Sequence, residues 1–170
     1  MQRLMLVSAV GALAVCSTLP AFAQSASARL EPTKGNATAG NVTFTQKGDK
    51  VAIEAKVSGL TPGGHGIHIH EKGDCSSGDG MSAGGHFNPT GKPHSNPSVP
   101  DHHAGDMPML VADVSGNASL STELGAMTVG SGATDIVGKA VIVHKDPDDY
   151  TTQPTGNSGG RVACGLIARN

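Results

Sequence analysis

The sequence is poor in aromatic residues and in charge. Its 170 residues include no tryptophan, one tyrosine and three phenylalanines, which excludes an aromatic platform for stacking bases. Twelve lysines and arginines stand against 14 acidic residues, for a formal charge of −2. This balance gives no basic excess that would attract nucleic acid or an anionic membrane. We therefore expect no nucleic-acid partner.

Long hydrophobic runs are also missing, apart from one stretch near the N-terminus. The apolar run from Leu4 to Val15 falls short of the roughly 20 residues that a membrane span needs. A single charge, Arg3, precedes it, and small residues occupy positions −3 and −1 before Gln24. This layout predicts a secretory signal peptide over residues 1–23.

The mature chain is then expected to be a single domain, residues 24–170, without membrane association. Two alternatives for the N-terminal segment are a retained membrane anchor and lipid attachment at Cys16. Against lipid attachment, Val15 stands where lipoprotein signals have a small residue. Cleavage leaves a formal charge of −3, because Arg3 is the only charge removed.

Cysteine is scarce as well. After cleavage only Cys75 and Cys164 remain, and an exported chain with two cysteines most simply forms one disulfide. On the chain-entropy model, closing a loop of about 90 residues stabilises the fold by roughly 4–5 kcal/mol. Two free thiols are the alternative. With the signal peptide, the pair predicts a periplasmic or secreted protein.

Glycine and proline, in contrast, are abundant. The 24 glycines and ten prolines make one residue in five, which favours short strands joined by turns over a helical bundle. Residues 41–57 show the clearest pattern. After a turn at 47–49, Val51, Ile53, Ala55 and Val57 alternate with Ala52, Glu54 and Lys56. Alternation of this kind predicts a hairpin with one buried face.

Further strands are expected along the chain, and no window has a convincing helical period. One strand, at 110–113, is expected to pair with 118–124 across the turn 115–117. A long segment without strand pattern, 71–108, is of the length that is usually functional. We predict an all-β antiparallel sandwich or flattened barrel with large loops. The other expected strands are 67–70, 139–144 and 161–168.

All eight histidines fall between His65 and His144. On a strand, His68 and His70 point to one face while Ile67 and Ile69 point to the other. This pair of histidines alone is a weak sign of a metal site. His86, His94 and His103 follow in the long segment. With Asp106 they supply three imidazoles and a carboxylate, the type and number of ligands of a tetrahedral zinc site. A sulfur-free set of His68, His70 and His144 suits copper.

Four motifs together resemble the copper/zinc superoxide dismutase family. They are GIHIHEKGD at 66–74, AGGHFNP at 83–89, HAGD at 103–106 and GGRVACGLI at 159–167. They occur in the family's order, and the similarity runs from about residue 35 to the C-terminus. The resemblance implies a Greek-key β-barrel or sandwich, immunoglobulin-like in architecture, with long metal-binding and active-site loops. It implies one copper and one zinc per subunit and, as the activity, dismutation of superoxide to oxygen and hydrogen peroxide in antioxidant defence.

The resemblance also assigns roles residue by residue. Arg161 resembles the active-site arginine that attracts the anion, Asp148 the outer carboxylate that ties His68 to His94, and Cys75 with Cys164 the family's disulfide. His86 resembles the histidine that bridges the two metals and has a catalytic part. The implied ligands are, for copper, His68, His70, His86 and His144; for zinc, His86, His94, His103 and Asp106.

Some features depart from the family or stay outside its motifs. The segment between Cys75 and His86 is longer than in common eukaryotic members. We expect this difference to alter the contact between the two subunits of a homodimer. The loop from 146 to 160 has no lysine or arginine, so Arg161, the metals and lysines 72, 92 and 145 are left to attract superoxide.

His65 and His102 match no ligand position, and we expect them to face solvent. A copper-storage module without catalysis is the rival function, but no Met-x-Cys-x-x-Cys motif is present and a storage site needs no arginine.

Overall fold

The computed structural model describes residues 24–170, so the predicted signal peptide and Cys16 lie outside the described residues. Within them the regular structure is a set of antiparallel strands and one 3-10 turn, η1 (Met81–Ala83). No helix in this part of the chain is long and apolar enough to span a membrane. The strands are β1 (Ser25–Pro32), β2 (Ala39–Lys47), β3 (Lys50–Ser58), β4 (Gly63–His65), β5 (Ile67–His70), β6 (Leu110–Ala112), β7 (Ala118–Leu124), β8 (Ala140–His144) and β9 (Arg161–Arg169).

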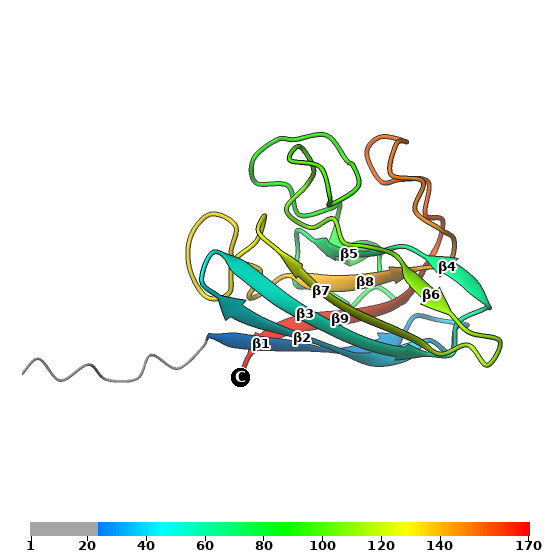
Figure 1. The fold of residues 1–170 in the computed structure, drawn as a ribbon. Coiled ribbons are helices and arrows are strands. Elements are labelled where there is room, and N and C mark those ends of the chain that lie inside the picture. The colour runs from blue at the N-terminus through cyan, green and yellow to red at the C-terminus, as the bar shows by residue number, and fades with distance from the viewer. Residues whose placement is uncertain (1–23) are drawn as a thin grey trace, which may run out of the picture.

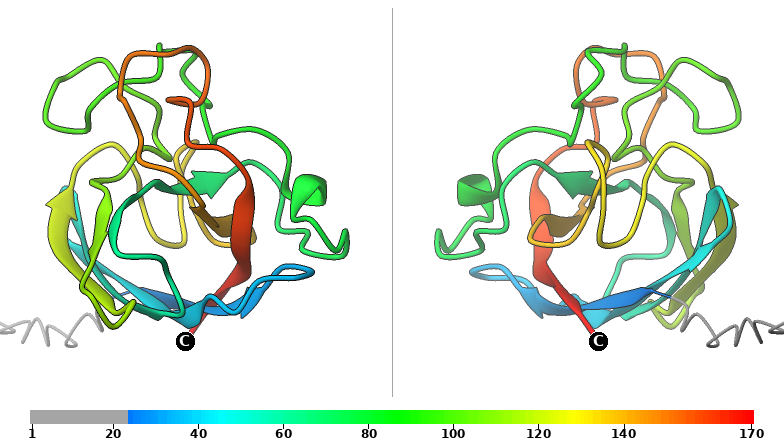
Figure 2. Two further views of the ribbon diagram at one scale, coloured as in Figure 1. Left: turned by 90° about the vertical axis from the view of Figure 1, so that its right-hand side faces the viewer. Right: turned by 90° about the vertical axis from the view of Figure 1, so that its left-hand side faces the viewer.

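Seven of these strands form one sheet that curls into a half-barrel (Figures 1 and 2). Their order is β5-β8-β9-β1-β2-β3-β7, and β4 pairs with β6 in a separate two-stranded sheet. Neighbours in space are therefore often distant in sequence: the last strand, β9, lies between β1 and β8. The predicted all-β barrel is confirmed.

The core follows from alternation along the strands. On β3, Val51, Ile53, Ala55 and Val57 are buried, while the lysines and the glutamate between and before them are exposed. The predicted hairpin is also present, since β2 and β3 pair in register from Lys47↔Lys50 to Ala39↔Ser58. Inward-facing aliphatic side chains from both sides of the half-barrel form one hydrophobic cluster. This burial supplies most of the driving force for the fold.

One pairing predicted from the sequence is wrong. The turn at 113–117 exists, with the Asn117 carbonyl accepting a hydrogen bond from Asp113 N–H at 2.9 Å, but β6 and β7 do not pair with each other. Instead β7 pairs with β3, and β6 pairs with β4. A tight turn requires two segments to be close at one end, whereas the buried faces decide which ladder each strand joins.

Two long loops lie together at one end of the half-barrel. The segments 71–108 and 145–160 both rise above β5 and β8 and approach each other there (Figures 1 and 2). They hold little regular structure, as predicted, and they are fixed by hydrogen bonds of side chains to backbone. This end of the molecule contains the histidines.

Candidate metal centre

Two clusters of metal-binding side chains share one residue, His86. In each cluster the candidate ligand atoms lie within 4.8 Å of one another, and every member is buried. The structure thus brings together each of the seven residues expected to bind metal. The four-histidine cluster consists of His68, His70, His86 and His144; the carboxylate cluster consists of His86, His94, His103 and Asp106.

Strand geometry positions most of the four-histidine cluster. His68 and His70 point to one face of β5, while Ile67 and Ile69, both fully buried, anchor the other face in the core. Next to them β8 pairs with β5 antiparallel and ends at His144. Because these strands are fixed by ladder hydrogen bonds and core packing, three of the four rings stand on a rigid frame.

Backbone carbonyls orient two of these rings. His70 Nδ1 lies 2.9 Å from the Gly84 carbonyl oxygen, and His144 Nδ1 lies 3.3 Å from that of Gly159. A neutral imidazole has one N–H, which must sit on Nδ1 to donate to these carbonyls. The two Nε2 atoms, 3.4 Å apart, then face each other with lone pairs. Two facing acceptors need a cation between them.

The remaining two rings of this cluster also lack a partner at one nitrogen. His68 Nδ1 and His86 Nε2 are the two buried side-chain polar atoms within residues 24–170 that have no hydrogen-bond partner. Buried polar atoms are nearly always satisfied in folded proteins, so two orphaned nitrogens in one cluster fit a bound metal ion. The donor set, nitrogen without sulfur, suits copper.

Burial keeps these imidazoles neutral. Removal from water lowers the pKa of His68, places the pKa of His70 and of His144 well below the usual value, and lowers that of His86 to about 4. The neutral ring is the form that binds metal. All four rings are therefore ready as ligands at neutral pH.

The carboxylate cluster is centred on Asp106. Its Oδ1 atom lies 3.0 Å from His86 Nδ1, 2.9 Å from His94 Nδ1 and 3.4 Å from His103 Nδ1. Although burial acts in the opposite direction, hydrogen bonds from His103, His86 and His94 hold the pKa of Asp106 well below its usual range. Three imidazole nitrogens around one carboxylate oxygen make a compact N₃O set, the composition of a structural zinc site.

A second carboxylate, Asp148, joins the two clusters. Its Oδ2 accepts from His68 Nε2 at 2.5 Å, and its Oδ1 lies 2.9 Å from His94 Nε2. Burial lowers the pKa of His94, but hydrogen bonds to Asp106 and Asp148 outweigh it and raise that pKa to about 9. Asp148 thus contacts one ring of each cluster.

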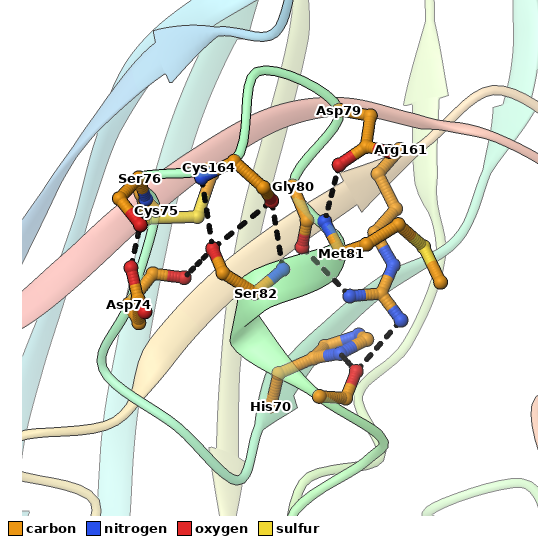
Figure 3. The surroundings of a disulfide bond; sticks show 12 residues. His70, Asp74, Cys75, Ser76, Asp79, Gly80, Met81, Ser82, Arg161 and Cys164 are labelled. Carbon is orange, nitrogen blue, oxygen red and sulfur yellow. Dashed lines mark hydrogen bonds between the residues drawn. A yellow bond between two sulfur atoms is a disulfide. The ribbon is translucent and has the colours of Figure 1, made fainter.

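Arg161 lies at the edge of the four-histidine cluster, held by the loop that the disulfide closes (Figure 3). Its Nη1 donates to the Gly80 carbonyl at 2.8 Å and its Nη2 to that of Gly84 at 2.7 Å. Gly84 is also the acceptor for His70, so one oxygen orients both the cation and a ring of the cluster. The Cys75–Cys164 disulfide is present, with Cα atoms 5.8 Å apart and a sequence separation of 89. A disulfide suggests a protein outside the cytoplasm.

Two histidines differ from expectation. His65 and His102 are buried rather than solvent-facing. His65 Nδ1 lies 2.9 Å from the His144 carbonyl oxygen, and its Nε2 lies 2.8 Å from the Thr61 carbonyl oxygen and 3.3 Å from the Thr61 hydroxyl. His102 Nδ1 lies 2.6 Å from the His103 carbonyl oxygen. Both rings satisfy backbone groups of buried segments, a role with no signature in residue type. Of the lysines proposed to attract superoxide, Lys92 is paired with Asp101 at 3.3 Å.

Sequence reasoning also missed the two carbonyl groups that accept from His70 and His144, because residue type does not mark such an acceptor. Gly84 and Gly159 contribute main-chain oxygens, which any residue could supply. The glycine-rich motifs at 83–89 and 159–167 marked the segments but not their function as hydrogen-bond acceptors.

The fold and the paired clusters define a metalloenzyme, and the comparisons with known proteins specify which kind. The family model described as copper/zinc superoxide dismutase matches residues 38–167, and this chain belongs to that family. A similar solved structure is the one titled "Crystal Structure Analysis of the clock protein EA4". It shares 39% sequence identity, with a TM-score of 0.77, over 89% of this chain and 99% of that one.

Membership makes the chain an oxidoreductase that dismutates superoxide with copper and zinc. The residues present fit both ions. Two facing lone pairs and two orphaned nitrogens suit copper in the four-histidine cluster, and the N₃O set around Asp106 suits zinc.

Proposed function

We propose that this chain is an exported superoxide dismutase whose copper is held by the four-histidine cluster and whose zinc is held by the carboxylate cluster. His86 is the ligand common to both ions. The observation that carries this assignment is the pair of orphaned nitrogens, His68 Nδ1 and His86 Nε2, buried beside two further nitrogens that face each other. No arrangement of protons on the rings satisfies all four.

The donor atoms follow from the hydrogen bonds already made. His70 and His144 use Nδ1 for backbone carbonyls and leave Nε2 for copper. His68 uses Nε2 for Asp148 and leaves Nδ1. His94 also uses Nε2 for Asp148, which leaves Nδ1 for zinc. Each of these four rings thus has one nitrogen for the protein and one for the metal, as is usual for histidine ligands.

Copper, when bound, supplies the alternation between two oxidation states by which one superoxide is oxidised to oxygen and another reduced to hydrogen peroxide; zinc supplies a fixed charge. Arg161 attracts the anion to the edge of the four-histidine cluster with a permanent positive charge. Its guanidinium is partly buried, which lowers its pKa while nearby Asp79 raises it. The two carbonyls that hold it fix its orientation. His86 can hold and release a proton at Nε2, its atom without a protein partner.

Export is supported by the disulfide and by the composition of residues 1–23. We propose cleavage before Gln24 and a periplasmic or secreted location for residues 24–170, free of the membrane. Sequencing the N-terminus of the protein recovered from its native compartment tests this, since a retained anchor or a lipid on Cys16 gives a different terminus. Sedimentation of the mature chain distinguishes a monomer from the homodimer implied by the family.

The enzymatic proposal is tested on the purified mature chain. Metal analysis is expected to give one copper and one zinc per chain, with superoxide-scavenging activity that depends on copper. A chain that binds both metals without scavenging superoxide would be a storage module. A chain that binds neither would contradict the assignment of both clusters.

A further inference from the structure

His94 stands in a segment without regular structure, yet both of its backbone polar groups are bound by one distant side chain. Its N–H donates to Gln153 Oε1 at 2.8 Å, and its carbonyl accepts from Gln153 Nε2 at 2.8 Å. The two residues are 59 positions apart. This pairing of an amide side chain with a main chain has the same two hydrogen bonds that join residues in an antiparallel ladder.

The partner of His94 Nε2 and the partner of both its backbone groups thus come from one loop, 145–160. Asp148 receives the ring at Nε2, and Gln153, five residues later, fixes the backbone. The same loop is held at a third point by Tyr150, whose hydroxyl accepts from Met109 N–H at 2.9 Å and whose own N–H donates to Asp148 Oδ1 at 2.7 Å. The part of this loop from 146 to 160 has no lysine or arginine, and these contacts give it a structural connection to the carboxylate cluster.

The loop also packs directly against this contact. A Cβ placed on Gly156 would collide with Asp148 Oδ1 and with His94 Nε2. Gly156 has a φ of +65°, which favours glycine. An outward movement of the loop would therefore take Asp148 and Gly156 away from the His94 ring at the same time as it breaks the two hydrogen bonds of Gln153 to the His94 backbone.

We infer that Gln153 is a positioning residue for the carboxylate cluster: it clamps the His94 backbone so that Nδ1 faces Asp106. The four-histidine cluster needs no such clamp, because β5 and β8 hold three of its four rings. Gln153 is itself exposed, so burial gives no sign of this role. The inference depends on the two hydrogen bonds that Gln153 makes with the His94 backbone. The inference rests on the proposed zinc site.

The test compares two neutral substitutions in the same loop. Gln153→Met keeps the length of the side chain and removes both bonds to His94. Thr152→Val is the matched control: it removes the bond from the Thr152 hydroxyl to Asp149 Oδ2 at 2.6 Å, within the loop, and leaves His94 untouched. Both sites are exposed, so folding is expected to be unaffected, and the melting temperature of each variant checks this.

Zinc affinity of the metal-free protein, measured against a chromophoric chelator, is expected to fall about tenfold in Gln153→Met, at the lower end of the scale for outer-shell partners. Copper affinity is expected to stay within about twofold. In the zinc-loaded, copper-free protein, exchange of the His94 amide proton is expected to accelerate in Gln153→Met and to remain slow in Thr152→Val.

Unchanged zinc affinity in Gln153→Met would overturn the clamp. So would equal losses in the two variants, which would indicate general loosening of the loop. If the parent protein itself binds no zinc, the proposed function fails instead, and the two failures are distinguishable.

Discussion

The four-histidine cluster and the carboxylate cluster share a ring but are built on different principles. Strands carry three of the four rings in the first, whereas the second draws all its members from the segment 71–108. Burial leaves only neutral imidazoles in the first. In the second, hydrogen bonds to Asp106 and Asp148 outweigh burial and raise the pKa of His94 to about 9, so this ring is protonated at neutral pH. One site is preformed by the sheet, and the other is assembled by hydrogen bonds between loops.

This difference teaches where each site is sensitive. A site on strands depends on its ligands, since the sheet holds them with or without metal. A site on loops depends equally on the groups that hold the loops. Substitution of ligands, pH and substitution of outer residues should therefore affect the two clusters unequally.

The largest effect is expected for His144→Ala. It removes a ring from the four-histidine cluster and none from the carboxylate cluster, so superoxide-scavenging activity should fall to background while zinc content is retained. Metal analysis and activity of the same preparation check this. Equal loss of copper and zinc would mean that the clusters do not act as two sites.

The second-largest effect is expected from a change of pH, which should alter the affinity for zinc more than the affinity for copper. Zinc must displace the proton that His94 carries below a pKa of about 9, so zinc affinity should rise by up to about tenfold per pH unit from pH 7 towards 9. Copper affinity should change much less, because the pKa values of His68, His70 and His144 are already lowered by burial. Calorimetry in buffers of different ionisation enthalpy measures the protons released. Equal proton release by both metals would remove this distinction.

Asp148→Ala tests the carboxylate that both clusters share. We expect metal binding to weaken by about 10–100-fold, the range for outer-shell partners, with zinc affected more than copper. His94 loses its Nε2 partner on a loop, whereas His68 stays fixed by β5. Titration of each metal into the variant measures this. Titrations that match the parent would exclude a role for Asp148 in holding the two rings.

Arg161→Glu should have the smallest effect on metals and a clear effect on rate. Reversing the charge at the edge of the four-histidine cluster should slow turnover more than tenfold, about 1.4 kcal/mol at the barrier, with a smaller change in copper affinity. Added salt should slow the parent more than the variant, because screening weakens an attraction that the variant has mostly lost. Parental rate and salt dependence in the variant would make Arg161 an ordinary surface cation.

Much of this contrast could be predicted from residue types. Alternation from Val51 to Val57 revealed the buried face of β3, and the spacing of His68 and His70 placed two rings on one face of β5. The strand β1 was not predicted, because its inward residues include Ala26 and Ala28, whose small side chains give a weak hydrophobic pattern. The pairing of β7 with β3 was missed because a turn shows proximity and not the partner in a ladder.

The parts of the site that the sequence left undetermined are those made by main-chain atoms. Gly84 O and Gly159 O choose which nitrogen of His70 and His144 is free, and no residue type marks a carbonyl acceptor. Burial of His65 likewise depends on the approach of Thr61 and the end of β8. Such contacts follow from the path of the chain in three dimensions.

The position of β9 has a consequence for the order in which the molecule can form. This strand, Arg161–Arg169, follows all the other strands in sequence, yet it lies inside the sheet between β1 and β8. A growing chain exposes the edges of both neighbours until these residues are available, and it cannot join β5 and β8 to the rest of the sheet. Cys164 and Arg161 arrive with the same strand. The disulfide, the closed sheet and the cation at the edge of the four-histidine cluster are therefore completed together, after the residues of all the other strands of this sheet are available.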